Sequence, residues 1–486
     1  MMAAMDPRPA GRDAARSRRA TTRRQILTGG AAAAIASAAA LMAACGPTTA
    51  ARSAAPAPTN PKTTLWWQPW RVGWGKGWDQ IFLSAAAPFL QKYPNIDLRI
   101  DVANNTWSDD GWVATQVLAG TGPDVFSGFG PESLIENGYV LDITGAVRKN
   151  NFDLGIFDKG QLDLYRRPSG LFALPAELST SCMAVNEGLL DDAGLVYPQA
   201  GWTYADAAQL WRQLTKVGKK GRVGTTFWAE GSDFAGPYYW KGWGADIVDP
   251  TDNHRAAFAS PAGIAFAEWL FPLVQAGVIG WGGGGSDLTG GASATTTLGS
   301  WNLPYVATAW HGLKWDFYPN PVWPTGETAY AGRDYYAVAS TTKHPDEAMT
   351  LLLWLMSTEW QRSMMQLQLV VPSIRALWSE WVGTVGQIAP PLAKKHLDAF
   401  ISGATKDRAF AMYAFGASSN RAYGLLFNWM AQIGSGKVTP RAGVEQGAAQ
   451  IDALEASLAA QATAQTHTAS QFPTSGPIIA SVTPGL

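Results

Sequence analysis

The sequence predicts an α/β fold divided into two lobes. Segments with the two-residue periodicity of strands alternate along the chain with segments that have the periodicity of helices. Such alternation is typical of sheets whose strands are largely parallel. About 440 residues follow the N-terminal segment, which is more than one hydrophobic core usually serves. With only 2 cysteines, the fold does not depend on disulfides.

The first elements follow one another closely. Short apolar runs predict strands, and amphipathic stretches predict helices between them. In order, we expect a strand at Thr64–Trp67, a helix over 79–92, an alternating strand at Asn95–Val102, a helix over 108–119 and a strand at Asp124–Phe126. Ligands of such sheets bind beyond the carboxyl ends of the strands.

Later helices are indicated by their first turns. Thr203 with Asp206 three residues later has the pattern of a capping box, in which each side chain caps the other residue's backbone N–H. Pro345 opens a helix to about residue 366, and Pro440 opens another near the end of the chain.

The N-terminal segment has the pattern of an export signal. Arg23 and Arg24 precede a weakly apolar stretch, residues 26–44, that ends at Cys45. The letters TRRQIL around the arginines resemble a twin-arginine (Tat) signal, and LMAACG around the cysteine resembles a lipoprotein lipobox. We therefore expect cleavage before Cys45, lipid on its sulfur, and an extracytoplasmic chain anchored to the cell membrane. An uncleaved transmembrane anchor is the alternative, although the stretch is barely long enough to span a bilayer.

The two ends of the chain have the composition of disordered segments. After a signal peptide of residues 1–44, residues 45–62 are rich in Pro, Ala and Thr and predict a flexible tether. Residues 466–486 predict a flexible tail. The other cysteine, Cys182, lies in an apolar run and is expected to be buried.

The charge of the chain argues against two classes of partner. The sequence has 37 basic and 38 acidic side chains, and the signal peptide contains more basic than acidic ones. The remaining chain is mildly acidic, so we expect no nucleic acid and no binding to an anionic membrane surface except through the lipid.

Aromatic residues are abundant, with 23 Trp, 14 Tyr and 18 Phe. Tryptophan combines a large apolar face with one N–H donor, which suits a sugar, whose C–H faces alternate with hydroxyl edges. The alternative is that these rings fill the core, and we expect this for Trp211, Trp269, Trp354 and Trp429, which lie in helical patterns.

Motifs of cofactor and metal sites were not found in the sequence. The 5 histidines lack metal-ligand spacing. The glycines at 282–285 are not followed by the Gly-Lys-Ser/Thr of a phosphate loop. The S-x-x-K string at 340–343 runs into Pro345, which disfavours the helix that this motif needs. We expect no cofactor and no metal.

A series of short motifs points to one family. In chain order they are FLQKYPNI at 89–96, GTGPDV at 120–125, GYVLDIT at 138–144, GLFALP at 170–175, AVN at 184–186, GWT at 201–203, and 334–343 with PDEA at 345–348. Together they resemble the bacterial extracellular solute-binding proteins of the sugar-binding group, which are related to maltose-binding protein.

The resemblance implies a two-lobed periplasmic-binding-protein-like (class II) fold with a hinge and an interlobe ligand cleft. One lobe would comprise residues 63–178 and 331–373, and the other 179–330 and 374–465. The implied function is an extracytoplasmic substrate-binding lipoprotein of an ABC importer. It would capture a carbohydrate, an oligosaccharide in view of the many rings, and deliver it to permease subunits with an ATPase. We expect a monomer.

The alternative is a lipid-anchored carbohydrate-active enzyme, a glycoside hydrolase or lyase. Glycoside hydrolysis needs two facing carboxylates, and Asp109, Glu132, Glu177 and Asp334 could each lie in a cleft. A sugar-binding site uses the same groups as hydrogen-bond acceptors, so their presence does not discriminate. The resemblance to a family without enzymatic activity over nearly the whole remaining chain favours binding alone. An adhesive lipoprotein would need repeats, and none is evident.

The ligand-binding residues are expected where strands end. Glu177, Asp334 and Gln68 would fix the hydroxyl pattern while aromatic rings stack on sugar faces, with core packing as the alternative for each ring. The candidates are Trp67, Gln68, Trp70, Phe129, Glu132, Glu177, Asp334 and Tyr335 and, by resemblance, Tyr239, Trp240, Trp301 and Trp310.

Overall fold

The computed structural model describes the greater part of the chain after residue 61. The described residues are 62–69, 78–100, 110–217, 219–227, 236–281, 286–326, 329–330, 332, 334–404, 409–410, 415 and 419–470. The chain divides into two units, Met1–Thr59 and Asn60–Leu486, and every described residue belongs to the second. The expected export signal, Arg23, Arg24, Cys45 and nearly all of the tether lie outside the described residues. Among the helices that are described, none is both long and apolar enough to cross a membrane.

The first sheet has five strands in the order β2-β1-β3-β15-β6. β1 pairs in parallel with β2 and β3, whereas β15 is antiparallel to both of its neighbours, β3 and β6. The strands are β1 (Thr63–Trp67), β2 (Ile96–Ile100), β3 (Val125–Phe129), β6 (Ala173–Pro175) and β15 (Asp334–Val338).

The second sheet repeats this arrangement in the order β11-β8-β12-β7-β13. β8 is parallel to β11 and β12, and β7 is antiparallel to β12 and β13. The strands are β7 (Ser181–Asn186), β8 (Val223–Phe227), β11 (Ile279–Trp281), β12 (Ser293–Gly299) and β13 (Trp315–Tyr318).

Each sheet therefore has one reversed strand, in the fourth place of its order. β7 follows β6 of the first sheet, and β15 follows the segment after the second sheet's last strand. A chain that leaves one sheet at its carboxyl edge and enters the next at the same kind of edge must run against the other strands. The predicted α/β class is confirmed, and the reversed strand is the consequence of crossing between sheets.

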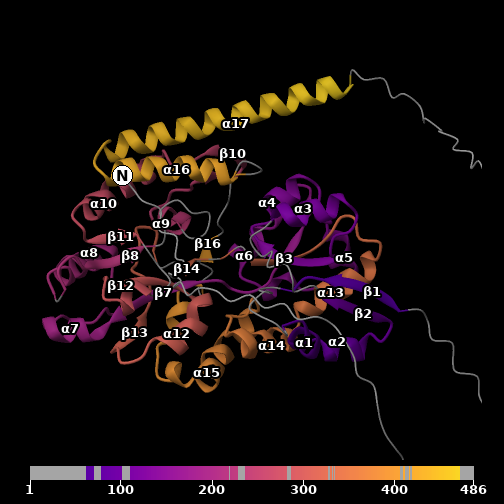
Figure 1. The fold of residues 1–486 in the computed structure, drawn as a ribbon, viewed down its shortest axis with the longest axis horizontal. Helices are drawn as coiled ribbons and strands as arrows, with labels where there is room; N and C mark the ends of the chain where they lie inside the picture. The colour runs from indigo at the N-terminus through magenta and orange to yellow at the C-terminus, as the bar shows by residue number, and fades with distance from the viewer. Residues whose placement is uncertain are drawn as a thin grey trace, which may run out of the picture. The chain divides into compact units, whose positions relative to one another are not determined.

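Helices surround both sheets, and Figure 1 shows them grouped around each sheet. Those that the chain places with the first sheet are α1 (Trp78–Ala85), α2 (Ala87–Lys92), α3 (Asp110–Leu118), α4 (Glu132–Glu136), α5 (Thr144–Lys149), α6 (Lys159–Asp163), α13 (Pro345–Leu355) and α14 (Thr358–Gln368). The others are α7 (Glu187–Ala193), α8 (Tyr204–Leu214), α9 (Gly236–Gly242), α10 (Pro261–Gln275), α11 (Ser286–Thr289), α12 (Leu303–Ala309), α15 (Trp378–Ile388), α16 (Ser419–Gly434) and α17 (Pro440–Ser470).

Three two-stranded ribbons complete the described strands. They pair β4 (Arg166–Arg167) with β5 (Gly170–Leu171), β9 (Val248–Asp249) with β10 (Asp252–Ala256), and β14 (Ala329–Tyr330) with β16 (Ala409–Phe410). Short 3-10 helices lie at Leu154–Ile156, Ser300–Asn302, Arg375–Leu377, Pro390–Leu392 and Leu397–Phe400.

Two stretches predicted as single helices are divided. The helix expected over 79–92 is broken at Ala86, because Pro88 lacks an N–H and is placed in the first turn of α2. The helix expected from Pro345 ends at Leu355, and Ser357 caps a new one by accepting the N–H of Trp360 at 3.2 Å. α17 continues to Ser470, so the first residues expected in the tail are helical.

The predicted capping box is present at the start of α8. Thr203 Oγ1 accepts the N–H of Asp206 at 3.2 Å, and Asp206 Oδ2 accepts the N–H of Thr203 at 2.9 Å. The N–H of Thr203 and its hydroxyl, which lies 2.7 Å from Asp206 Oδ2, both donate to the carboxylate and hold the pKa of the Asp206 carboxyl below its usual value. The helix start was therefore predictable from local sequence.

The buried apolar side chains form three clusters. One surrounds the first sheet, a second covers one face of the second sheet with α8, α10, α16 and α17, and a third covers its other face with α12 and α15. Trp211 and Trp354 are buried in these cores as predicted, and Trp269 packs at the edge of the second. Trp429, also expected in the core, is only partly buried and belongs to none of the three clusters. Cys182 is also fully buried, as expected, and burial raises the pKa of its thiol.

Among the described residues, three segments connect the first sheet and its helices with the second sheet and its helices. We call residues 176–180 the first crossing, the segment containing Gly332 the second, and residues 369–374 the third. The N–H of Leu178 in the first crossing donates to Val371 O in the third at 2.9 Å, and the N–H of Gly332 donates to Ser179 O at 2.8 Å. The first crossing therefore lies between the other two and is hydrogen-bonded to both.

Candidate ligand-binding site

The carboxyl edge of the first sheet gathers four of the predicted polar residues. β1, β3 and β6 end at this edge, followed by Gln68, Glu132 and Glu177, and the reversed strand β15 begins there with Asp334. All four side chains are buried, with 2, 6, 1 and 3% of their surface exposed, respectively. Because buried polar groups need hydrogen-bond partners, this concentration of polar side chains makes the edge the candidate ligand-binding site.

Glu177 and Asp334 lie on adjacent segments. The carbonyl of Asp334 accepts the N–H of Ala176 at 2.9 Å and the hydroxyl of Tyr165 at 2.8 Å. Ser179 Oγ donates to Glu177 Oε1 at 2.9 Å. Both predicted carboxylates thus lie in or directly beside the crossings.

Gly332 allows the first two crossings to approach closely. A Cβ atom at this position would lie 2.2 Å from Ser179 Cβ and 2.8 Å from Asp334 Oδ2. Only a residue without a side chain fits there. The spacing between Ser179 and the Asp334 carboxylate therefore depends on this glycine.

Gln68 has a fixed backbone and an available side-chain oxygen. Its N–H donates to Val125 O at 2.9 Å, and its carbonyl accepts from Ser127 Oγ at 3.2 Å. Within the described part of the chain, Oε1 of Gln68 has no hydrogen-bond partner. Such a buried acceptor can take a ligand hydroxyl. Trp70, the next candidate along the chain, lies outside the described residues.

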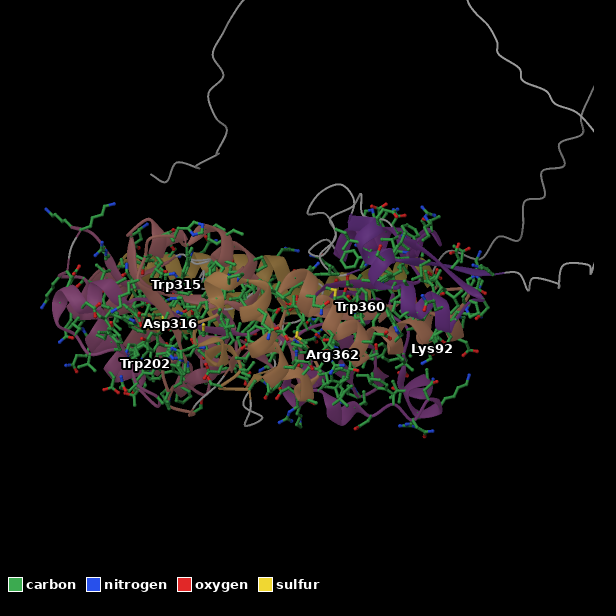
Figure 2. All side chains as sticks on the ribbon, turned by 90° about the horizontal axis from the view of Figure 1, so that it is seen from below. Lys92, Trp202, Trp315, Asp316, Trp360 and Arg362 are labelled. Atoms are coloured by element: carbon green, nitrogen blue, oxygen red, sulfur yellow. The ribbon has the colours of Figure 1, made fainter. Side chains whose placement is uncertain are left out.

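The structure places the predicted rings of the first lobe differently. Trp67 is fully buried against Phe82 and Trp360, with ring centroids 6.1 and 5.3 Å apart. Figure 2 labels Trp360 on the same lobe as Lys92. Tyr335 is also fully buried, whereas Phe129 is only partly buried and pairs across the sheet with Asp334. Of these rings, Phe129 alone keeps some surface exposed at the edge that carries the polar groups.

Most of the rings predicted as ligand contacts in the second lobe are also buried in the core. Trp240 is 1% exposed between Phe258 and Phe266 in the core, and Trp310 packs against Trp315 in the third cluster. Tyr239 stacks on Phe227 at 4.2 Å, and its hydroxyl lies 2.9 Å from Thr297 Oγ1. We assign packing roles to Trp240, Trp310 and Tyr239.

Trp301 is a partly exposed ring at the carboxyl edge of the second sheet. It follows β12, and its ring packs edge-on against Tyr330 with centroids 5.9 Å apart. A Cβ atom on Gly299 would lie 2.3 Å from this ring. The ring therefore lies over the end of its own strand, in the place where a sheet of this class binds its ligand.

Two further buried polar residues, Ser179 and Asp158, were not predicted from the sequence. Ser179 is 3% exposed and hydrogen-bonded to Glu177, and Asp158 is fully buried and caps α6 through the N–H of Gly160 at 2.9 Å. The letters Asp158-Lys159-Gly160 are an N-cap signal that could have been read. No sequence signal indicates that Ser179 contacts Glu177. Within the described residues, no His, Cys, Asp and Glu side chains are grouped as for a metal ion.

The sequence matches one known protein family. Residues 68–362 match the family described as bacterial extracellular solute-binding protein. The chain belongs to this family. Membership identifies it as a solute-binding protein and not as an enzyme, which removes the glycoside hydrolase alternative. None of the curated proteins matches the sequence.

Solved structures agree on the fold. The sugar-binding protein MalE from Xanthomonas citri has a TM-score of 0.66 at 17% identity, with 81% of this chain and 98% of that chain covered. The cyclic α-maltosyl-1,6-maltose binding protein from Arthrobacter globiformis has a TM-score of 0.67 at 15% identity, with 81% and 99% covered. The substrate-binding protein Lmo0181 from Listeria monocytogenes, solved with cycloalternan, has a TM-score of 0.64 at 18% identity, with 81% and 99% covered. The two-lobed fold expected from the sequence is confirmed.

Proposed function

We propose that this solute-binding protein captures a carbohydrate between the carboxyl edges of its two sheets. The lobes would comprise residues 63–178 with 331–373, and 179–330 with 374–465, as the sequence predicts. The buried polar groups of the first lobe would accept sugar hydroxyls, and Trp301 of the second would stack on a C–H face of the ring. Similarity to structures of a sugar-binding protein, a substrate-binding protein solved with cycloalternan and a cyclic α-maltosyl-1,6-maltose binding protein supports this class of ligand.

The observation that carries the proposal is the pairing of two kinds of surface. Four buried polar side chains gather at one sheet edge, and a partly exposed indole lies at the same kind of edge of the other sheet. Sugars need both, because each ring has hydroxyl edges and an apolar face. We infer an oligosaccharide from the similarity to the cyclic α-maltosyl-1,6-maltose binding protein, since most of the candidate rings lie in the core.

The first prediction concerns Trp301. In a thermal-shift screen of mono- and oligosaccharides, a correct ligand at about 100 times its Kd should add about 2.7 kcal/mol to stability. Trp301→Ala should weaken binding of that ligand at least tenfold, because the stacking surface is lost, and should leave the ligand-free melting temperature nearly unchanged. Titration calorimetry measures the affinity.

The control for Trp301 is Trp429, a partly buried tryptophan on α16 whose indole N–H bonds Gln450 at 2.7 Å. Trp429→Ala should leave sugar affinity unchanged. Normal binding by Trp301→Ala would remove this ring from the site, and the absence of any stabilising sugar in the screen would contradict the ligand class.

We also propose that the protein is a lipid-anchored monomer that delivers its ligand to permease subunits with an ATPase. The lipobox motif at Cys45 and the arginine pair support export and acylation. Cys45→Ala should abolish incorporation of radiolabelled palmitate and leave the chain either uncleaved or released from the membrane fraction. Arg23→Lys combined with Arg24→Lys should block export by the Tat route. Unchanged palmitate incorporation by Cys45→Ala would contradict the anchor, and unchanged export of the double variant would contradict the route.

A further inference from the structure

A group of cations lies where α8 ends. Arg212 is in the last turn of the helix, and Lys216, Lys219 and Lys220 follow in the turn that leads to β8. All four side chains are exposed, and within the described part of the chain none of them pairs with a carboxylate. We call these four residues the basic turn.

Several exposed cations elsewhere have acidic partners. Lys149 pairs with Asp346 at 3.2 Å, and Arg362 pairs with Glu380 at 2.7 Å. Such pairs cancel much of the local field, whereas the basic turn keeps its positive charge. It therefore stands out on a chain that, after the signal peptide, is mildly acidic.

The helix dipole does not account for the basic turn. A cation in the last turn of a helix is stabilised by the exposed carbonyls there, and Arg212 has this position. The effect fades beyond the last turn. Because α8 ends at Leu214, Lys219 and Lys220 lie outside its range.

The backbone of the basic turn is held in place. Arg222, which follows it, donates from Nε to Gly291 O and from Nη1 to Val217 O, both at 3.0 Å. The N–H of Arg222 also donates to Lys219 O at 3.2 Å. Gly291 precedes β12, so these bonds attach the turn to the sheet and present the lysines from a fixed position.

The basic turn lies at the amino edge of the second sheet, since β8 begins at Val223 directly after it. Figure 1 shows α8 beside β8. The proposed ligand contact Trp301 follows the other end of the sheet, after β12. A partner bound at the basic turn would therefore leave the ligand-binding edge uncovered.

The proposed lipid anchor supplies an anionic surface within reach. A fully extended tether of residues 45–62 spans at most about 60 Å. A domain of this length has a radius of gyration of about 22 Å, so the tether lets any face of the domain touch the membrane. Tethering also raises the effective concentration of lipid, so that a weak contact suffices.

We propose that the basic turn binds the anionic phospholipid headgroups of the membrane in which Cys45 is anchored. Lysine is a hydrated point charge without the two-point geometry of arginine, so exposed lysines suit a surface of many charges rather than one coordinated phosphate. The net charge of the chain predicted no such binding, but net charge is an average that conceals a local cluster. The proposal rests on the proposed anchor for its setting.

The test uses residues 45–486 with Cys45→Ser, which contain every described residue but lack the signal peptide and the lipid. Cosedimentation is measured with vesicles of phosphatidylcholine and phosphatidylglycerol in equal parts, and with pure phosphatidylcholine. The parent should bind the anionic vesicles at about 0.05 M salt and lose them at about 0.5 M. Each lysine should contribute about fivefold to the partition coefficient, so combining Lys216→Gln, Lys219→Gln and Lys220→Gln should lower it at least tenfold.

The control removes the same charge from other elements. Lys92→Gln, Arg148→Gln and Lys437→Gln replace exposed cations on α2, on α5 and between α16 and α17. This triple variant should bind nearly as the parent does, and circular dichroism should show both variants folded. The proposal is overturned if the parent does not bind anionic vesicles, which would favour an acidic protein as the partner. It is also overturned if pure phosphatidylcholine binds equally, or if both triple variants lose binding to the same extent. Because the assay contains neither acylated protein nor sugar, none of these outcomes contradicts the anchor or the ligand class.

Discussion

Replacing Trp67 with alanine is expected to lower the free energy of unfolding by about 3–5 kcal/mol. Trp67 is fully buried at the end of β1, and its ring contacts Phe82 and Trp360. Truncation leaves a cavity that the surrounding rings cannot fill, because they belong to different helices. Urea unfolding of the full chain, followed by tryptophan fluorescence and circular dichroism, measures the loss.

The comparison for Trp67 is Trp301→Ala, which should change stability by less than about 1 kcal/mol because its ring is partly exposed. The two variants test which rings belong to the core and which to the ligand. If Trp67→Ala unfolds at the parental urea concentration and loses sugar binding, the ring is a ligand contact and our assignment to the core is wrong.

Replacing Gly332 with alanine is expected to damage both the hinge and the site. The new Cβ would lie 2.2 Å from Ser179 Cβ, an atom fixed to the backbone of the first crossing, and 2.8 Å from Asp334 Oδ2. Separating the crossings to relieve this overlap should cost about 1–3 kcal/mol. It should also weaken ligand binding more than tenfold, because the Asp334 carboxylate and the Ser179–Glu177 pair move apart. Calorimetric titration and thermal unfolding measure the two effects.

Gly145 is the control for this substitution. It lies in α5, and a Cβ atom there would meet nothing within 4 Å. Gly145→Ala should keep ligand affinity and raise stability by up to about 1 kcal/mol, since alanine favours the helix. Parental affinity and stability for Gly332→Ala would show that the crossings can separate without consequence, contrary to the site described here.

Local sequence predicted those helix starts and strands that depend on residues close together in the chain. The capping box of Thr203 and Asp206 placed the start of α8, and the alternation of Asn95–Val102 predicted β2. The break at Ala86 depends on Pro88, a signal present in the sequence that periodicity outweighed. The reversed strands β7 and β15 could not be predicted from period alone, because their direction is set by the chain's passage between sheets.

The residues of the candidate site also differ in whether local sequence could predict them. Polar residues after strands were predictable, since Gln68, Glu132 and Glu177 each follow a strand that ends at one edge. The exposure of the aromatic candidates could not be predicted from the sequence. Trp67 and Trp301 both lie beside strand ends, yet one is enclosed by rings from distant helices and the other keeps part of its surface.

The sequence by itself determined the class of the chain, the capped start of α8 and the positions of its strand-end polar groups, because these depend on neighbours close along the chain. Tertiary structure alone decided which tryptophans are buried and how the crossings meet. The close approach at Gly332 and the hydrogen bond from the N–H of Leu178 to Val371 O join segments far apart in sequence. Burial and hydrogen bonding between such segments depend on the packing of the whole domain, which no local pattern specifies.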